Sequence, residues 1–433
     1  MKKGFFRTSQ VESKAISRKT TIAQCGKCKL KEQTEYEPLN STGEGETPLL
    51  NIGNRLSSLE CKKREHFIDG NGKYYERVLR RHGIELKKCT NTSVIQCPQI
   101  QNKKLKKSNI DSCFPNVKKI IEQTSPQVII GIGDQTIESL ISPKFDKSFS
   151  AVSVFRGFAI PDRDYKAWVC PVFSPSYILA EKTASVAKKI FDDDIAQAVS
   201  LLDVPLPSYI NEKEEDKIEI LRQPKEINAW LAATISKAEQ TKLLAAFDFE
   251  TSGLKPHHPD QFIRTCAISL DPHHAVAFPM QCSTTFLSLF AQFLYHKNIY
   301  KIAANMKFEN DWANVKLRMP VKNWFFDTMI GMHYVDNRQS ICSLEFMNYV
   351  YFGIEPYDSH IKKFIKKPNS KGNEMNDIAK ADLHDLLIYN GMDAMTEFRH
   401  GIVQMEQIGI KYGRFYSGPS AEELAPQYFL RRD

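Results

Sequence analysis

Two acidic side chains share one predicted strand in the second half of the chain. In LLAAFDFE (243–250), Asp248 and Glu250 stand two residues apart, so both side chains leave the same face of the strand. The surrounding residues are apolar, and an unpaired acidic pair inside such a strand would be costly to bury. Carboxylate oxygens paired in this way suit Mg²⁺ or Mn²⁺. The segment therefore predicts a divalent-cation site rather than an exposed edge strand.

A second acidic segment follows in IAANMKFENDW (302–312). Asn305 ends a predicted strand, and Glu309 and Asp311 begin a predicted helix. Residues two apart on a helix point about 200° apart, so only one of the two acids can face the cations. Glu309 is the preferred candidate, and Asp311 is the alternative.

A third segment, LLIYNGMDAMTEF (386–398), has the pattern of a helix. Tyr389 and Asp393 lie at i and i+4, so they share one face. A lone Tyr-x-x-x-Asp is mostly helix surface, but here it follows DFET and NMKFE in order. The three segments together predict one site built from distant parts of the chain.

In this order, DFETSGL, NMKFE and YNGMD resemble the motifs of the DnaQ-like 3′–5′ exonucleases, in the variant found in the proofreading domain of family A DNA polymerases. The resemblance spans about residues 216–412. It implies an RNase H-like fold and two Mg²⁺ or Mn²⁺ ions that clamp the scissile phosphate. It implies Asp248, Glu250 and Asp393 as direct or water-mediated ligands, with Tyr389 orienting the attacking water. Glu309 stands where the family has an aspartate.

Two further residues have supporting roles under this resemblance. Asn305 is expected to tie the second motif to the backbone and is counted among the DNA contacts. Asp327, which follows in DTM (327–329), is expected to cap a helix or to support a ligand rather than bind a cation.

The first half carries a different set of ligands. Cys25 and Cys28 form a Cys-x₂-Cys pair, and Cys97 and Cys113 are separated by fifteen residues. Four thiolates suit either Zn²⁺ or an iron–sulfur cluster, and spacing alone does not choose between them. The other six cysteines lie mostly in apolar runs, where they are typical packing residues.

The sequence around these cysteines resembles the iron–sulfur uracil-DNA glycosylases over about residues 20–200. The resemblance is carried by HFIDGNGKYYERVL, SVIQCPQIQNKK, CFPNVKKIIEQTSPQVIIGIGDQ, FRGF and SPSYIL. It implies that Cys25, Cys28, Cys97 and Cys113 hold a [4Fe–4S] cluster, which we prefer over zinc.

The catalytic signature of that family is eroded in this chain. The family's Gly-Glu-Ala-Pro-Gly loop is replaced by GNRLS (53–57), its uracil-reading asparagine by Ser93, and the histidine of its His-Pro-Ser motif by Ser174. Phe67, the stacking ring, survives. Without the acid, the amide and the imidazole, a glycosylase loses both base discrimination and leaving-group stabilisation. We therefore expect a glycosylase fold without glycosylase activity.

Charge is distributed unevenly. Residues 1–203 hold 33 Lys and Arg against 23 Asp and Glu, whereas residues 204–433 hold 26 against 28. A basic half is expected of a part that lies on a polyanion. The candidate DNA contacts are Lys62, Lys63, Arg64, Lys103, Lys104, Lys106 and Lys107.

These patterns divide the 433 residues into two α/β domains. We expect a basic arm (1–24), a parallel-sheet α/β/α glycosylase-like domain with a four-cysteine cluster (25–203), a linker (204–215) and an RNase H-like exonuclease domain (216–433). Strands are expected at 49–53, 91–97, 128–133, 152–160 and 167–173 of the first domain and at 243–250, 265–270 and 274–280 of the second. Helices are expected at 72–83, 111–123 and 185–202.

The arrangement resembles the N-terminal half of family A DNA polymerases from tailed bacteriophages, and the chain shows no polymerase motifs. The polymerase is then a separate subunit or a missing C-terminal part. No apolar run is long enough to span a membrane, and ten cysteines without a secretion signal imply a reducing compartment. We therefore expect a cytoplasmic protein, in the infected bacterial host if the chain is from a phage. The leading hypothesis is a metal-dependent proofreading exonuclease. The alternatives are a DNA- or polymerase-binding accessory module with weak or no nuclease activity, and RNA 3′ processing.

Overall fold

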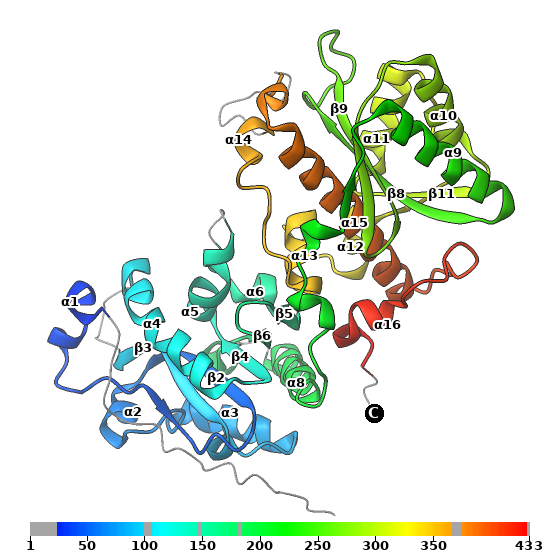
Figure 1. The fold of residues 1–433 in the computed structure, drawn as a ribbon. Helices are drawn as coiled ribbons and strands as arrows, with labels where there is room; N and C mark the ends of the chain where they lie inside the picture. Colours follow the sequence, from blue (N-terminus) through cyan, green and yellow to red (C-terminus); the bar gives the residue numbers. More distant parts are fainter. Residues whose placement is uncertain (1–23, 99–104, 146–148, 181–183, 366–374, 431–433) are drawn as a thin grey trace, which may run out of the picture.

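Two six-stranded sheets organise the chain into two lobes (Figure 1). The structure is a computed structural model, and it describes residues 24–98, 105–145, 149–180, 184–365 and 375–430. The predicted α/β class is confirmed, because both sheets are flanked by helices. The arm predicted at 1–24 lies outside the described residues except for Gln24.

The first sheet has the strand order β1-β3-β2-β4-β6-β5. Its central four strands run parallel, and the two edge strands are antiparallel to their neighbours. The parallel strands are buried almost throughout, as expected for a sheet covered by helices on both faces. The strands are β1 (Ser41–Thr42), β2 (Leu49–Leu56), β3 (Thr90–Pro98), β4 (Val128–Ile132), β5 (Ile160–Asp162) and β6 (Ala167–Val172).

One predicted strand of this lobe is wrong. Residues 152–160 form a short helix, α6 (Val152–Phe155), and only Ile160 joins a strand. The apolar residues Val152, Phe155 and Phe158 are buried as expected. Gly157, however, has a φ of +74°, which turns the chain before the strand begins. The other helices are α1 (Cys25–Cys28), α2 (Ser58–Lys63), α3 (Gly70–Arg81), α4 (Lys107–Thr124), α5 (Asp134–Thr136), α7 (Pro175–Ala180) and α8 (Ala184–Ser200).

The second sheet has the strand order β12-β11-β8-β9-β10-β7. Strands β8, β9 and β10 form an antiparallel meander, and β8, β11 and β12 run parallel to one another. The strands are β7 (Ile218–Ile220), β8 (Leu243–Thr251), β9 (Ile263–Asp271), β10 (His274–Pro279), β11 (Ile299–Ala303) and β12 (Trp324–Asp327).

Helices cover both faces of this second sheet. Helices α9 (Pro224–Gln240) and α10 (Thr284–Tyr295) cover one face, and the long helix α15 (Leu383–Gln407) crosses β8, β9 and β10 on the other (Figure 1). The remaining helices are α11 (Met306–Trp312), α12 (Thr328–Val335), α13 (Leu344–Phe352), α14 (Lys362–Ile365) and α16 (Ala421–Leu424).

Strand β8 places apolar side chains on one face of the sheet and acidic side chains on the other, because successive side chains alternate between the faces. Phe247 and Phe249 pack into the core beneath α9 and α10. Asp248 and Glu250, one residue out of step, therefore leave the opposite face, toward α15. The strand thus delivers its acids to the helix that carries the third motif.

The two lobes meet along a closely packed seam. Arg338 of the second lobe donates to the carbonyl oxygens of Ser153, Val154 and Arg156 at 2.8–3.1 Å. Gly353 adopts a φ of +63°, and a Cβ there would lie 2.0 Å from the Pro161 carbonyl oxygen. Only glycine permits this approach, so the seam is a built contact and not a loose meeting of surfaces.

The segment predicted as a linker (204–215) carries two short 3-10 helices and lies against this seam. Tyr209 is buried, and its hydroxyl donates to the Leu424 carbonyl oxygen at 2.9 Å. Glu214 is also buried. Across the described residues, every helix is too short or too polar to pass through a bilayer.

Candidate active site

Three carboxylates converge where β8 faces α15. Oxygen atoms of Asp248, Glu250 and Asp393 all lie within 4.8 Å of one another. Glu250 is buried, and the two aspartates are half-buried. Among the described residues, none of the three forms an ion pair with Lys, Arg or His. The arrangement is one that hard divalent cations favour, because it offers charged oxygens and no competing positive group.

The electrostatics reflect this crowding. Burial raises the pKa of Asp248 to about 7, although the Asn390 amide opposes the shift by donating to Asp248 Oδ2 at 2.7 Å. Burial and the charges of Asp248 and Asp393 raise the pKa of Glu250 well above its usual range. Burial and Asp248 do the same to the pKa of Asp393. A bound cation would reverse these shifts, because opposite charge favours the ionised form.

The second motif presents one of its two acids to the cluster. Glu309 on α11 is 2% exposed, and its pKa is raised by burial and by the Asp248 charge. Its Oε2 atom has no hydrogen-bond partner among the described residues. Asp311 is half-exposed and contributes to none of these shifts. The helix thus turns Glu309 inward and leaves Asp311 at the side.

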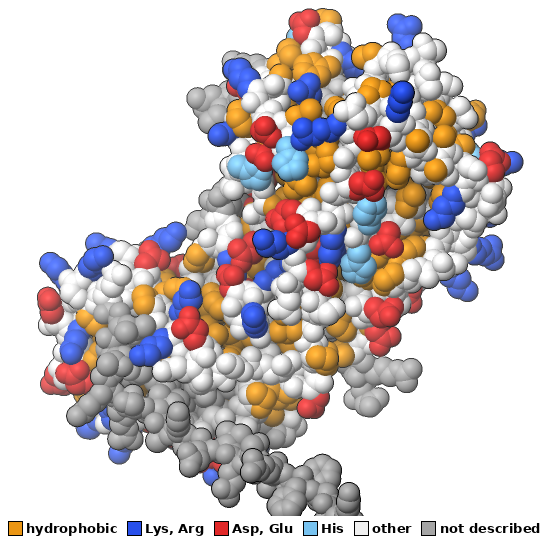
Figure 2. Space-filling model, in the orientation of Figure 1, with side chains coloured by type: hydrophobic (Ala, Val, Ile, Leu, Met, Phe, Trp, Pro, Cys, Tyr) orange, Lys and Arg blue, Asp and Glu red, His pale blue; other side chains and the backbone are white. Residues whose placement is uncertain are grey.

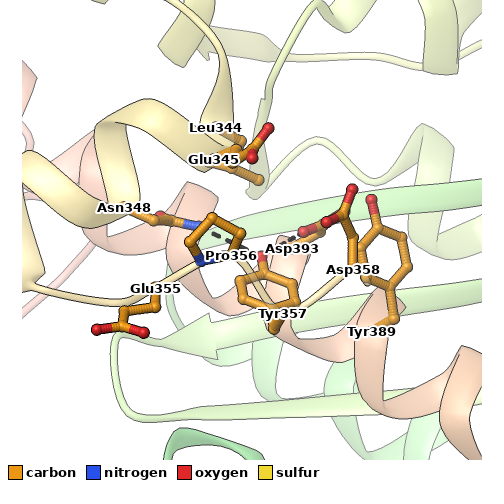
Figure 3. A pocket seen from close by; sticks show the side chains of 9 residues that line it. All are labelled: Leu344, Glu345, Asn348, Glu355, Pro356, Tyr357, Asp358, Tyr389 and Asp393. Atoms are coloured by element: carbon orange, nitrogen blue, oxygen red, sulfur yellow. Dashed lines mark hydrogen bonds between the residues drawn. The ribbon is translucent and has the colours of Figure 1, made fainter. Parts of the chain in front are cut away.

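Two tyrosines act on Asp393, and only one was identified from the sequence. Tyr357 donates a hydrogen bond to the Asp393 carboxylate, the Tyr389 hydroxyl opposes the rise in the pKa of Asp393, and the two rings are 5.7 Å apart. Figure 3 shows Tyr357 directed at Asp393 beside Tyr389. Tyr357 lies in the loop after α13, where no periodicity marks it. Nothing in the sequence pattern could have placed it here.

Sequence reasoning also missed Glu397, one turn beyond Asp393 on α15. It is 1% exposed, and burial and the charges of Asp248, Glu309 and Asp393 raise its pKa well above the usual range. A signal was available, because Tyr389, Asp393 and Glu397 follow one another at intervals of four and so share a helix face.

Asp327 and Asn305 support the second motif through the backbone. Asp327 Oδ1 accepts from the Met329 and Ile330 amides, which caps α12, and its carboxylate also accepts from the Asn305 and Met306 amides. Asn305 has a φ of +61° and an exposed side chain. Asn305 is therefore bonded to the rest of the site through its backbone N–H and not through its side chain.

The four candidate cluster cysteines gather at one end of the first sheet. Cys25 and Cys28 bracket α1, Cys97 is near the end of β3, and Cys113 is on α4, which contacts α1. Burial and the other three thiols raise the pKa of Cys97 to about 12. Within the described residues, no three of these thiols approach one another within 4.8 Å.

Polar groups of the protein reach the same cysteines. Asn109 Nδ2 donates to Cys28 Sγ at 3.4 Å. Burial lowers the pKa of Arg55, and the neighbouring Cys97 and Cys28 thiols oppose that shift. Arg55 belongs to the segment that replaces the glycosylase catalytic loop, so one residue of that loop now lies beside the cysteines.

The remaining positions of the glycosylase signature lie in two separate places. A Cβ on Gly53 would lie 3.3 Å from both the Phe67 ring and Ser93 Oγ, so these three positions meet. Ser174 Oγ lies 3.0 Å from Ser176 Oγ and accepts from the Tyr177 amide. The serine at the histidine position therefore serves its own helix terminus.

The candidate DNA contacts differ in whether the side chain is already bonded within the protein. Lys62, Lys63, Lys106 and Lys107 are exposed. Arg64 instead donates to the Glu37 and Pro38 carbonyl oxygens at 2.8–3.2 Å. Lys103 and Lys104 lie outside the described residues. On the face seen in Figure 2, blue Lys and Arg side chains of the first lobe stand among red acidic ones.

Comparisons with known proteins assign the two lobes separately. Residues 41–223 match the family model of the uracil DNA glycosylase superfamily, and residues 223–399 match that of a 3′–5′ exonuclease. The type-4 uracil-DNA glycosylase of Sulfurisphaera tokodaii is 23% identical over 192 residues, which are 43% of this chain and 84% of that protein.

Solved structures resemble the chain only distantly. Brucella melitensis NrnC bound to pGG is 16% identical, with 45% of this chain and 81% of that chain covered and a TM-score of 0.31. Escherichia coli RNase D is 12% identical, with 45% and 51% covered and a TM-score of 0.28. Likeness this low does not bear on substrate. The family models are decisive: the chain joins a uracil-DNA-glycosylase-like domain to a 3′–5′ exonuclease domain, in that order.

Proposed function

We propose that this protein is a metal-dependent 3′–5′ DNA exonuclease of the proofreading type, with an N-terminal DNA-binding domain that has lost glycosylase activity. The observation that carries the proposal is the convergence of Asp248, Glu250 and Asp393 within 4.8 Å, without a cationic partner among the described residues. Buried carboxylates left in this state need a cation, because mutual repulsion and desolvation both oppose their ionisation.

The residues divide the work of phosphodiester hydrolysis. When bound, a pair of Mg²⁺ or Mn²⁺ ions supplies the Lewis acidity that activates water and steadies the leaving 3′-oxygen. Asp248, Glu250 and Asp393 hold that charge, and Glu309 reaches it from α11. Tyr389 orients the attacking water through its hydroxyl, while Tyr357 and Asn390 fix the positions of Asp393 and Asp248.

A DNA oligonucleotide labelled at its 5′ end tests the activity. In Mg²⁺ or Mn²⁺ we expect stepwise shortening from the 3′ end, and we expect Asp248→Ala to abolish it. Glu406→Gln, an exposed change on α15, is the matched control. An RNA strand of the same sequence separates DNA proofreading from RNA processing. Binding without shortening would favour the alternative function, an accessory module for DNA or for a polymerase.

The N-terminal domain is proposed to hold DNA without cutting a base from it. Support comes from the exposed lysines and from the serines at the base-reading and histidine positions. Purified protein should release no uracil from single-stranded or duplex DNA. Removing two of the domain's exposed positive charges with Lys62→Ala and Lys63→Ala should lower DNA affinity and reduce the slope of its salt dependence. Measurable uracil release, or an unchanged salt slope, would contradict the respective part.

We further propose that Cys25, Cys28, Cys97 and Cys113 hold a [4Fe–4S] cluster. The four cysteines lie at one end of the first sheet, on α1, β3 and α4, and thiolates are ligands that suit both Zn²⁺ and an iron–sulfur cluster. The resemblance of this lobe to the iron–sulfur uracil-DNA glycosylases favours the cluster. Anaerobically purified protein should show a visible absorption band and contain iron; zinc in a colourless protein would contradict the assignment.

The biological setting proposed is phage DNA replication, with a DNA polymerase as a separate subunit or as a further part of the same protein. None of the ten cysteines, all of which are among the described residues, forms a disulfide, which suits the reducing cytoplasm of a bacterial host. Co-purification with a polymerase after tagged expression during infection tests the partnership. An isolated polymerase that already proofreads at full rate would contradict it.

A further inference from the structure

The seam between the two lobes extends to the loop that follows α13. Lys144, at the end of a 3-10 helix (Ser142–Lys144) in the first lobe, donates to Glu355 Oε1 in that loop at 2.5 Å. The Lys144 side chain is 6% exposed, and that of Glu355 is 39% exposed. The Lys144 ammonium group also contacts two acids of its own lobe, Asp162 at 3.2 Å and Asp164 at 2.8 Å. Lys144 therefore has its counter-charge within the first lobe and binds Glu355 in addition, across the seam.

The same loop carries Tyr357 to the exonuclease site. The Tyr357 hydroxyl donates to the Asp393 carboxylate and accepts from Asn348 Nδ2 at 3.3 Å. Glu355 and Tyr357 line one cavity together with Asp393. Figure 3 shows the Glu355 carboxylate turned away from Asp393 and the Tyr357 hydroxyl turned toward it. The loop is therefore bonded to the first lobe on one side and to a carboxylate of the site on the other.

The connection between these two contacts is short and stiff. Only Pro356 separates Glu355 from Tyr357. A proline ring fixes its own φ at about −65° and restricts the preceding residue to extended conformations. Just upstream, Gly353 lies so close to the Pro161 carbonyl oxygen that a Cβ would be 2.0 Å from it. A displacement of Glu355 would therefore be passed on to the Tyr357 hydroxyl and not be absorbed between them.

We propose that the first lobe positions the exonuclease site: its Lys144 holds Glu355, and this contact keeps Tyr357 on the carboxylate of the third motif. The proposal rests on the proposed exonuclease function and deepens it, because the glycosylase-like lobe then controls the geometry of that site in addition to binding DNA. Lys144 and Glu355 are positioning residues, since each acts on the site through the Tyr357 hydroxyl.

Glu355→Ala in the full chain tests this contact, and Asp164→Ala is the matched control. Each variant removes one carboxylate from Lys144 and leaves it two others, so the thermal midpoint should stay close to that of wild type. Asp164 is 66% exposed and belongs to the first lobe, not to the loop. In Glu355→Ala, we expect Mn²⁺ affinity and kcat on DNA each to fall about tenfold, as when a group that supports a metal ligand is removed. The KM for DNA should be unchanged, and Asp164→Ala should alter none of these quantities. The electron paramagnetic resonance signal of free Mn²⁺ gives the affinity.

Combination with Tyr357→Phe separates positioning from a general loosening of the seam. If Glu355 acts through the tyrosine hydroxyl, Glu355→Ala should add little to the loss that Tyr357→Phe already causes. Glu355→Gln, which can still accept a hydrogen bond from Lys144, should recover most of the affinity and of kcat. Additive losses, or a Glu355→Ala variant with the Mn²⁺ affinity of wild type, would overturn the proposal. Wild type that binds Mn²⁺ but does not shorten DNA would contradict the proposed function alone, because the Mn²⁺ comparison needs no substrate.

Discussion

The protein buries acidic side chains in two places and treats them in opposite ways. At the seam, Glu214 accepts from Arg399 at 2.6 Å and from Arg163 at 2.7 Å, and Lys217 lies 3.2 Å away. In the exonuclease site, buried acids meet other acids instead. The pKa values diverge accordingly. Burial alone would raise that of Glu214, but Arg399 and its other cationic neighbours lower it to about 2, whereas that of Asp248 rises to about 7.

The difference separates acids that hold the fold from acids that await a ligand. A buried charge that serves structure has its counter-charge supplied by the chain, because the penalty of leaving it unpaired is several kcal/mol. Asp162 is a second example at the seam, paired with Lys144 and hydrogen-bonded by the Tyr349 hydroxyl at 2.8 Å. Asp248, Glu250 and Asp393 have no cationic partner among the described residues, so their charge is available for a cation that the chain does not itself supply.

Asp248→Asn should have the largest effect and should split activity from stability. We expect DNA shortening to fall at least about 10³-fold, because the cation held by Asp248 contributes several kcal/mol. Thermal unfolding of the metal-free protein should move upward, since a repulsive buried charge is removed. Glu406→Gln is the control for both measurements. A metal-free variant less stable than wild type would break the comparison.

Glu214→Gln should lower the stability of the protein and leave its activity on DNA unchanged. It leaves Arg399 buried without its carboxylate, so urea unfolding should show a loss of about 3–5 kcal/mol, while the chemical step on DNA is untouched in the folded fraction. Lys217→Ala serves as a milder comparison at the same network, since its side chain is more exposed. Equal stability of Glu214→Gln and wild type would show that the seam does not depend on this pair.

The pH dependence of that loss follows from the pKa of Glu214. Because it is lowered from 4.5 to about 2 in the folded state, its contribution is fully present above pH 4.5 and disappears as the pH falls toward 2. The stability difference between wild type and Glu214→Gln should therefore shrink as the pH is lowered through that window. A difference that stays constant down to the acid limit would mean that the lost stability is not electrostatic.

Tyr357→Phe should produce a smaller effect on the metal site. Removal of the hydroxyl leaves the Asp393 carboxylate less firmly held. We therefore expect Mn²⁺ affinity and the rate of DNA shortening each to fall by about tenfold. Tyr389→Phe, which also removes the water-orienting hydroxyl, should cost more activity for a similar change in affinity. Identical kinetics for the two variants would argue against separate roles.

The smallest effect tests the choice between the two acids of α11. Glu309→Gln should weaken shortening, whereas Asp311→Asn, half-exposed and turned aside, should change it far less. Steady-state rates at saturating Mn²⁺ compare them. A larger loss in Asp311→Asn would reverse the assignment of the second motif.

Much of the candidate site could be predicted from the sequence, because the patterns that reveal it lie within single strands and helices. The alternation in β8 showed that Asp248 and Glu250 share a face, and the i, i+4 spacing on α15 did the same for Tyr389 and Asp393. What it could not show was contact across the fold. Tyr357 lies in an irregular loop, and Glu214 sits in a stretch rich in acids that looks solvated until Arg399, 185 residues away, is seen opposite.

The strand expected at 152–160 failed for a related reason. Val152, Val154 and Phe155 are apolar in either conformation, so composition does not distinguish a short helix from a strand there. The positive φ of Gly157 and the long-range hold of Arg338 on the neighbouring carbonyls decide it.

That hold has a consequence for the length of nucleic acid the protein can use. Arg338 donates to three backbone carbonyls across the seam, and these bonds oppose rotation of the first lobe toward the second. The distance between a nucleic-acid strand bound on the first lobe and its 3′ terminus in the second lobe is then set by the fold. Oligonucleotides shorter than this span should gain nothing from the basic lobe, and longer ones should gain all of it at once.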